Sequence, residues 1–296
     1  MRLAGLLLLS CWSVYATTFC VTIAGLGGEP DYDQRFAGWA QTIDSTMKSA
    51  GADVKVHTLS GPAATKSALQ STLAQIGREA KAQDSLIVML IGHGTFDGSE
   101  YKINLPGPDV AAVELAAWLD RVPAGRQLVV NMTSASGASV HALQRENRTV
   151  ITATKSGTEK NATVFARYWI EALRDGAADT DKNEVISALE AFRFAEQKTK
   201  QFYETQKRLS TEHALLDGGD QQGPLLAGRF PVLKIGSIQA AAKDPAKQAL
   251  LVKRAQLEEQ IDGLKFQKAA MPIEEYKKQL SALLLELART QAELDK

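Results

Sequence analysis

Two apolar runs in the sequence end in residues that could carry out hydrolytic chemistry. His93 and Gly94 follow the run Ser85–Ile91, and Ser134 lies in the small-residue turn after Gln127–Val130. A histidine can act as a general acid or base, and a serine hydroxyl attacks carbonyl groups when a base lies within hydrogen-bond reach. Small residues in a turn also let backbone N–H groups approach a bound group closely. These residue types predict a hydrolytic centre.

Buried strands are expected to bring the two positions together. Six of the seven residues from 86 to 92 are Leu, Ile, Val or Met, which is typical of a strand covered on both faces of a parallel sheet. Predicted helices and strands alternate along the chain, so we expect an α/β fold with one mainly parallel sheet between two layers of helices. Ligands bind at the carboxyl ends of the strands in such sheets. His93 and Ser134 should therefore share one edge of the sheet.

An apolar strand ending in His93-Gly94, followed by a second strand with the turn Ser134-Ala135-Ser136-Gly137, resembles the legumain-like branch of the legumain and caspase group of cysteine peptidases. The resemblance covers residues 18 to 235 and implies a caspase-like three-layer fold. The mechanism it implies has a cysteine thiolate attacking the peptide carbonyl while His93 protonates the leaving group. Backbone N–H groups near Gly94 would hold the oxyanion. The sequence departs from the family at the nucleophile, because Ser134 stands where the family has its cysteine.

This departure leaves two hypotheses about function. A thiol with a pKa near ~8.5 is partly ionised at neutral pH, whereas a serine hydroxyl depends on a neighbouring base. One hypothesis is a degenerate peptidase that binds a peptide or protein ligand in its cleft or acts as a scaffold. The other is an active peptidase or hydrolase that uses Ser134 with His93. Thr133 and Ser136 are alternative hydroxyls, although the register of the turn favours Ser134.

A calcium site is predicted in the loop from residue 179 to residue 190. Positions 1, 3, 5 and 12 of an EF-hand loop supply side-chain oxygens and position 7 supplies a backbone carbonyl. In this loop those positions are Asp179, Asp181, Asn183, Glu190 and, at position 7, Val185. The residue at position 6 is a glutamate instead of the usual glycine, and the alternative interpretation is a solvated acidic loop. Calcium is the one cofactor that the sequence indicates.

The N-terminus has the features of a secretory signal peptide over residues 1 to 16. Met1-Arg2 precede an apolar run, and Ala16 ends a small-residue cleavage site, so the mature chain should begin near Thr17. A secreted or periplasmic location follows from this prediction. The apolar run is shorter than the ~20 residues that span a bilayer, which disfavours a membrane anchor. A lipoprotein signal ending at Cys11 is a less favoured alternative.

The rest of the 296-residue chain divides into one large domain and a helical tail. A net charge of zero, with no basic block, gives nucleic-acid binding no support. We expect the large domain over residues 17–238 and a C-terminal α-helical hairpin or coiled coil over residues 244–296. Leucines recur every seven residues in each half of the tail, at 250, 257 and 264 and at 280, 287 and 294. The apolar stripe of this hairpin should either pack on its own domain or bind a protein partner or a second copy.

Overall fold

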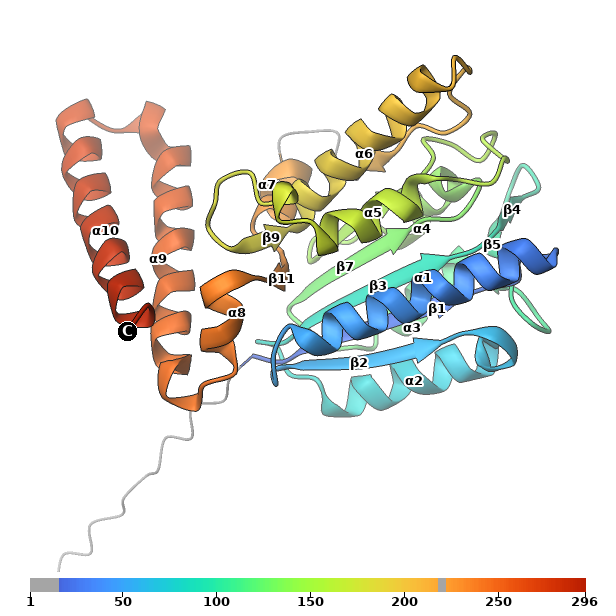
Figure 1. Ribbon diagram of the computed structural model, residues 1–296, viewed down its shortest axis with the longest axis horizontal. Helices are drawn as coiled ribbons and strands as arrows, with labels where there is room; N and C mark the ends of the chain where they lie inside the picture. The colour runs from blue at the N-terminus through green and yellow to red at the C-terminus, as the bar shows by residue number, and fades with distance from the viewer. Residues whose placement is uncertain (1–15, 218–221) are drawn as a thin grey trace, which may run out of the picture.

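The computed structural model describes residues 16–217 and 222–296 and is built on a six-stranded sheet (Figure 1). The strand order is β10-β8-β7-β3-β1-β2, with β10 antiparallel to β8 and the other neighbours parallel. These strands are β1 (Thr18–Ala24), β2 (Val54–Leu59), β3 (Ser85–Ile91), β7 (Arg126–Asn131), β8 (Arg148–Thr152) and β10 (Leu215–Leu216). The predicted mainly parallel sheet is confirmed.

Helices cover both faces of the sheet, as the apolar strands require. Along β3, Leu86, Val88 and Leu90 belong to one buried cluster, whereas Ile87 and Met89 belong to the other. Figure 1 shows α1, α5 and α6 in front of the sheet. The helices of the domain are α1 (Pro30–Ser49), α2 (Lys66–Glu79), α3 (Ala112–Leu119), α4 (Val140–Leu143), α5 (Phe165–Arg174), α6 (Ala188–Thr205) and α7 (Gln222–Gly228). The predicted three-layer α/β fold is confirmed.

Two small sheets extend from this core. The segment after His93 forms a three-stranded antiparallel sheet of β4 (Gly94–Phe96), β5 (Tyr101–Ile103) and β6 (Val110–Ala111). β11 (Pro231–Lys234) pairs with β9 (Val185–Ser187) and lies outside the main sheet. The main sheet ends at the two-residue strand β10.

The tail forms the predicted helical hairpin from α9 (Gln248–Gln267) and α10 (Ile273–Leu294), and α8 (Gly236–Ala242) lies between it and the domain (Figure 1). Leu257 and Leu264 are buried, whereas Leu284 and Leu285 on α10 are about half exposed. Most of the apolar stripe therefore packs within the chain itself. Among the described helices, none is both long enough and apolar enough to cross a bilayer.

Candidate functional site

Gly94 and Ser134 meet at the carboxyl edge of the sheet, because β3 and β7 are neighbours. The Gly94 N–H donates a hydrogen bond of 3.3 Å to the Ser134 Oγ atom, and both residues are buried. The approach is close enough to require glycine. A Cβ atom on Gly94 would lie 2.5 Å from the Ser134 carbonyl oxygen and 2.8 Å from the Thr133 Oγ1 atom. The structure thus brings together two of the three predicted catalytic positions.

The His93 ring packs among aromatic side chains of α1. Its centroid lies 5.0 Å from that of Tyr32 and 5.3 Å from that of Phe36, in edge-on geometry in both cases. Within residues 16–217 and 222–296, no hydrogen bond joins the His93 ring to Ser134 or to any other group. The His93 backbone carbonyl accepts from the Asn104 N–H at 3.0 Å. The end of strand β3 therefore predicts that His93 lies at the carboxyl edge of the sheet. No sequence motif predicts its contacts with Tyr32 and Phe36.

A buried polar network underlies the turn that carries Ser134. The Asn131 Oδ1 atom accepts from the Thr133 hydroxyl at 2.8 Å and from the Tyr101 hydroxyl at 3.2 Å. Its Nδ2 atom donates to Ser139 Oγ at 3.0 Å. Burial raises the pKa of Tyr101 to about 12, so its hydroxyl stays protonated at neutral pH. The hydroxyl of Thr133, one of the alternative nucleophiles, therefore stabilises the turn through its hydrogen bond to Asn131.

Ser136 and Ala135 are held by the loop that follows β8. The Ser136 Oγ atom accepts from the Thr154 N–H at 3.1 Å, and the Thr154 Oγ1 atom accepts from the Gly137 N–H at 2.9 Å. Ala135 has a left-handed backbone conformation (φ 55°), and its N–H donates to the Glu159 carbonyl at 2.8 Å. A non-glycine residue pays ~1–2 kcal/mol for this conformation. The turn is therefore fixed by tertiary contacts, and Ser136 acts as part of its framework.

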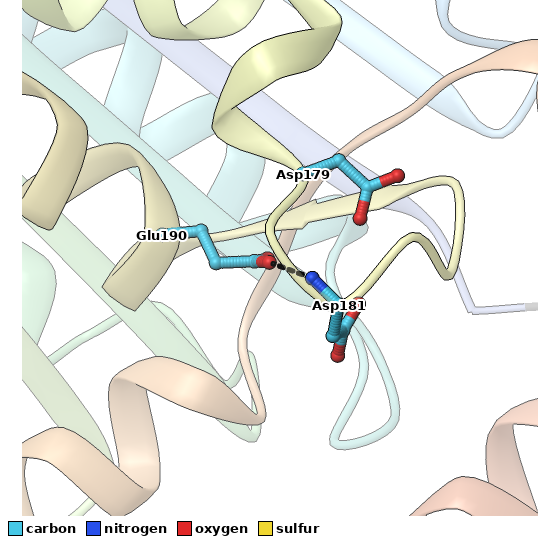
Figure 2. A group of neighbouring side chains, drawn as sticks. All are labelled: Asp179, Asp181 and Glu190. Atoms are coloured by element: carbon cyan, nitrogen blue, oxygen red, sulfur yellow. Dashed lines mark hydrogen bonds between the residues drawn. The ribbon is translucent and has the colours of Figure 1, made fainter.

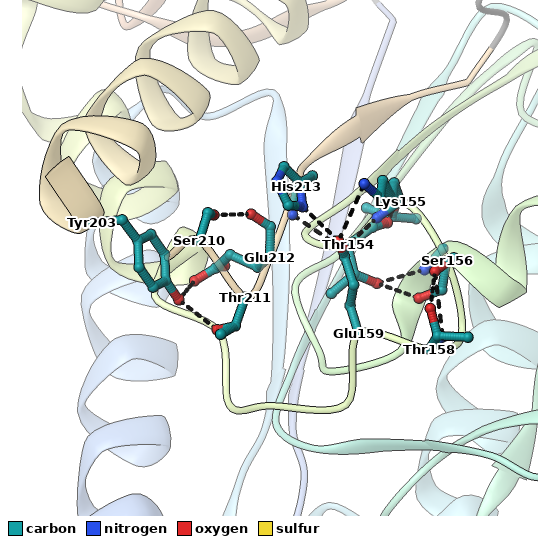
Figure 3. A network of polar contacts seen from close by, with 12 residues as sticks. Thr154, Lys155, Ser156, Thr158, Glu159, Tyr203, Ser210, Thr211, Glu212 and His213 are labelled. Carbon is teal, nitrogen blue, oxygen red and sulfur yellow. Dashed lines mark hydrogen bonds and ion pairs between the residues drawn. The ribbon is translucent and has the colours of Figure 1, made fainter. Parts of the chain in front are cut away.

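The carboxylate of Glu159 ties this loop to His213 (Figure 3). It accepts from the backbone N–H groups of Lys155 at 2.9 Å and of His213 at 3.1 Å. The Nδ1 atom of His213 lies 2.5 Å from Glu159 Oε1, and the His213 ring is half exposed. His213 thus supports the loop that holds the Ser134 turn.

Glu212 is a second acidic residue of this region that sequence reasoning missed. It is only 2% exposed, and its carboxylate accepts from the Val164 and Phe165 N–H groups at the start of α5. Its Oε1 atom also accepts from the Tyr203 hydroxyl at 2.9 Å (Figure 3). Burial raises the pKa of Glu212 despite these hydrogen bonds. The contacts to Val164 and Phe165 span 48 and 47 positions in sequence, so no local motif identifies Glu212.

The loop from 179 to 190 brings three of the predicted calcium ligands, Asp179, Asp181 and Glu190, close to one another (Figure 2). Carboxylate oxygens of Asp179, Asp181 and Glu190 all lie within 4.8 Å of one another. Asp179 accepts from the N–H groups of Asn183 at 3.1 Å and of Glu184 at 3.0 Å, so it closes the loop on itself. Three carboxylates at this spacing form a hard oxygen donor set of the kind that calcium prefers.

The pKa values of two acidic residues in the loop are shifted in opposite directions. Asp181 is exposed at the surface, yet partial desolvation and the nearby carboxylate of Glu190 raise its pKa. Burial alone would raise the pKa of Glu190, but hydrogen bonds from Ser187 and Thr180 hold it below the usual value. Glu190 and Ser187 form the capping box at the start of α6, with Ser187 donating to Glu190 Oε2 at 2.8 Å. Glu190 is therefore both a helix cap and a candidate ligand.

Glu184 takes the conformation that position 6 demands. Its φ is 61°, in the region where glycine is normally required. Its carboxylate accepts from the Ser237 hydroxyl at 2.5 Å and from the Ile238 N–H at 3.0 Å at the start of α8. Val185 donates its N–H to Asn183 Oδ1 at 2.8 Å. The contacts to α8 supply a reason for glutamate at this position that the sequence pattern did not offer.

A cavity of about 420 Å³ lies at the opposite edge of the sheet from Ser134, where the amino ends of β1, β3 and β7 face α8 and α9. Its lining includes Thr18 and Ser85 from the sheet, Ala16 just before β1, and Leu251 from the hairpin. This cavity is remote from the predicted catalytic residues.

Comparisons with known proteins give a fold likeness and no family. No protein-family model matches the chain, and no curated protein matches it. A structure from Geobacter sulfurreducens is similar over 75% of this chain and 99% of its own, with a TM-score of 0.49 and 11% identity. The Drosophila initiator caspase Dronc is similar over 68% of this chain and 78% of its own, with a TM-score of 0.44 and 9% identity. Chaetomium thermophilum Raptor is similar over 55% of this chain but only 19% of its own, with a TM-score of 0.37 and 11% identity. The fold assignment stands on the strand order and layers described above.

Proposed function

We propose that the chain is an exported caspase-like domain that has lost peptidase chemistry and acts as a binding or scaffolding module. The observation that supports this most is the hydrogen bond from the Gly94 N–H to the Ser134 hydroxyl. An amide N–H stabilises negative charge, but it cannot remove the proton from a serine hydroxyl. Among residues 16–217 and 222–296, no histidine or carboxylate shares a hydrogen bond with the Ser134 hydroxyl, so the described chain offers no base of the kind on which a serine nucleophile depends.

The position of His93 supports the same proposal. Its ring contacts Tyr32 and Phe36 and shares no hydrogen bond with Ser134 in the described part of the chain. The Gly94 N–H, which the family resemblance assigns to the oxyanion, is also in use by the Ser134 side chain. The alternative, an active hydrolase that uses Ser134 with His93, requires rearrangement of both side chains.

Covalent labelling and peptide binding test the two parts of this proposal. Wild type and Ser134→Ala are incubated with a fluorophosphonate that reacts with activated serines, and adducts are read by intact mass. Fluorescence anisotropy then measures binding of labelled peptides that contain Asn or Asp. We expect bound peptides and no adduct on wild type. An adduct that Ser134→Ala abolishes would show a working nucleophile, and absence of peptide binding would remove the cleft as the binding surface.

Calcium binding by the loop from 179 to 190 is a second proposed activity. It is favoured by the convergence of three carboxylates and by the raised pKa of Asp181, because a divalent cation would relieve the repulsion between these groups. Asp179, Asp181, Asn183, the Val185 carbonyl and Glu190 would hold the ion.

Calorimetry with calcium chloride on wild type, Asp181→Asn and Asp175→Asn tests the calcium proposal. Asp175 lies outside the loop and caps a short helical turn, so its variant serves as a charge-matched control. Asp181→Asn is preferable to Glu190→Gln because Glu190 also caps α6. We expect binding to wild type and Asp175→Asn, with affinity lost or at least tenfold weaker in Asp181→Asn. No binding heat from wild type at millimolar calcium would contradict the proposal.

A further inference from the structure

Asp84 is a buried carboxylate that lacks a cationic partner. It is 4% exposed and lies just before β3. Its Oδ1 atom accepts from the Thr17 N–H at 2.8 Å, and its Oδ2 atom accepts from the Lys81 N–H, also at 2.8 Å. No ion pair within residues 16–217 and 222–296 involves Asp84. A charge removed from water in this way is costly unless it is both hydrogen-bonded and paired.

The residue that faces Asp84 is also the one at which the mature chain is expected to begin. Ala16 is exposed, whereas Thr17 is held at the sheet by a hydrogen bond from the Ser85 N–H to the Thr17 carbonyl at 2.9 Å. Cleavage after Ala16 would convert the Thr17 amide into an α-ammonium group. That change replaces one neutral donor, 2.8 Å from the carboxylate, with a positive charge that carries three donors.

We propose that leader removal after Ala16 creates the counter-ion of Asp84, so that the α-ammonium of Thr17 and the buried carboxylate form an ion pair. Hydrolysis of the Ala16–Thr17 peptide bond consumes one water, which leaves a carboxylate on the leader and an ammonium on Thr17. The precursor has only the amide hydrogen bond at this position. The domain therefore reaches its full stability only after the leader is removed, so the precursor is less stably folded while it is exported.

Two other charged side chains at this edge of the sheet make contacts away from Asp84. The Asp53 carboxylate pairs with Lys234 Nζ at 2.7 Å. The Arg126 guanidinium donates to the Arg229 carbonyl at 3.2 Å. Thr17 is thus the backbone position best placed to supply a charge to Asp84. This ion pair rests on the export proposed above but not on the chemistry of Ser134, so its absence would leave the loss of peptidase activity untouched.

The first test is the N-terminus of the exported protein. The full chain with its own leader is expressed in a bacterial host and isolated from the exported fraction, and its intact mass is measured. We expect a chain that begins with Thr17. A mature chain that retains Ala16, or that begins after Thr17, would overturn the proposal because no ammonium would then lie against Asp84.

The second test is the thermal stability of chains that begin at Thr17 or at Ala16, each as wild type and as Asp84→Asn. We expect the Thr17 start to raise Tm by roughly 3–6 °C in wild type and to have no effect in Asp84→Asn. Equal Tm values for the two wild-type chains, or a gain that persists in Asp84→Asn, would overturn the ion pair.

The pH dependence of this gain tests the ion pair without any substitution at Asp84. An α-amino group has an ordinary pKa near 8, and a carboxylate partner raises this pKa in the folded state. The gain should therefore be complete below about pH 8 and should disappear as the pH rises through the raised value. A gain that is constant from pH 6 to pH 10 would contradict a titrating ammonium, even if Asp84→Asn fails to fold.

Discussion

Replacing Gly94 with alanine tests whether the ends of β3 and β7 meet as described. The new Cβ atom would lie 2.5 Å from the Ser134 carbonyl oxygen, 2.7 Å from Tyr101 Cε2 and 2.8 Å from Thr133 Oγ1. Atoms at such separations must move apart, and one of these neighbours is backbone. All three neighbouring residues are buried, and two of them belong to the polar network under the turn. Relaxation therefore has to distort the turn itself.

The expected cost of Gly94→Ala is about 2–3 kcal/mol in the free energy of unfolding, the upper part of the ~1–3 kcal/mol that overfilling a packed core typically costs. For a domain of this size that corresponds to a Tm lower by roughly 5–10 °C. Gly38→Ala is the matched control, because Gly38 lies on the exposed face of α1 and nothing lies within 4 Å of its added Cβ atom. The control should gain about 0.5–1 kcal/mol, since alanine favours helices.

Thermal and urea unfolding followed by circular dichroism measure both variants. The two strand ends would have to be further apart than described if Gly94→Ala kept the wild-type Tm to within about 1 °C. A similar loss in both variants would point to a general sensitivity of the fold and would also refute the reasoning.

Three further predictions concern buried and surface charges. Arg148 and Arg145 both pair with Asp120, but only Arg148 is buried, at 2% exposure. Arg148→Met should therefore lower the free energy of unfolding in urea by about 3 kcal/mol, and Arg145→Met by under about 1 kcal/mol. Equal losses would contradict the assignment of Arg148 as the buried partner. Glu184→Gln should lower Tm at pH 7 by about 1–3 °C. Hydrogen bonds to the carboxylate lower the pKa of Glu184 in the folded chain. The ionised carboxylate therefore stabilises the fold above the unfolded-state pKa of ~4.3, and this stabilisation is lost as the pH falls through the folded-state pKa. A Tm difference that persists at pH 3 would contradict this. Calcium at 1 mM should raise the Tm of wild type more than that of Asp181→Asn, and equal shifts would argue against the loop as the site.

The sheet could be predicted from sequence because its strands are short apolar runs with clear ends. The strand Ser85–Ile91 has the same bounds in the structure as in the prediction. All seven of its residues are buried, so the apolar run and the strand begin and end together. The pairing of β11 (Pro231–Lys234) with β9 could not be predicted, because an apolar pattern indicates burial and does not indicate which strand is the partner. α8 was missed because its start depends on the Glu184 carboxylate, more than fifty residues earlier in the chain.

The candidate site was predictable in position but not in contacts. Strand ends in a parallel sheet share an edge, so the proximity of Gly94 and Ser134 follows from strand order. The orientation of the His93 ring depends on Tyr32 and Phe36 of α1, and such side-chain packing leaves no spacing motif. The support of the Ser134 turn by Glu159 comes from the fold of a loop after β8, which composition does not specify.

Ser134 with His93 should not cleave peptides, and a comparison of three chains in one kinetic assay measures this. Hydrolysis of peptides after Asn or Asp is measured as kcat/KM for wild type, Ser134→Ala and Ser134→Cys. We expect wild type to match the Ser134→Ala background and Ser134→Cys to exceed it, because a thiol ionises without a neighbouring base and differs from the hydroxyl only by sulfur in place of oxygen. Wild-type cleavage that Ser134→Ala abolishes would contradict the account and establish Ser134 as a working nucleophile.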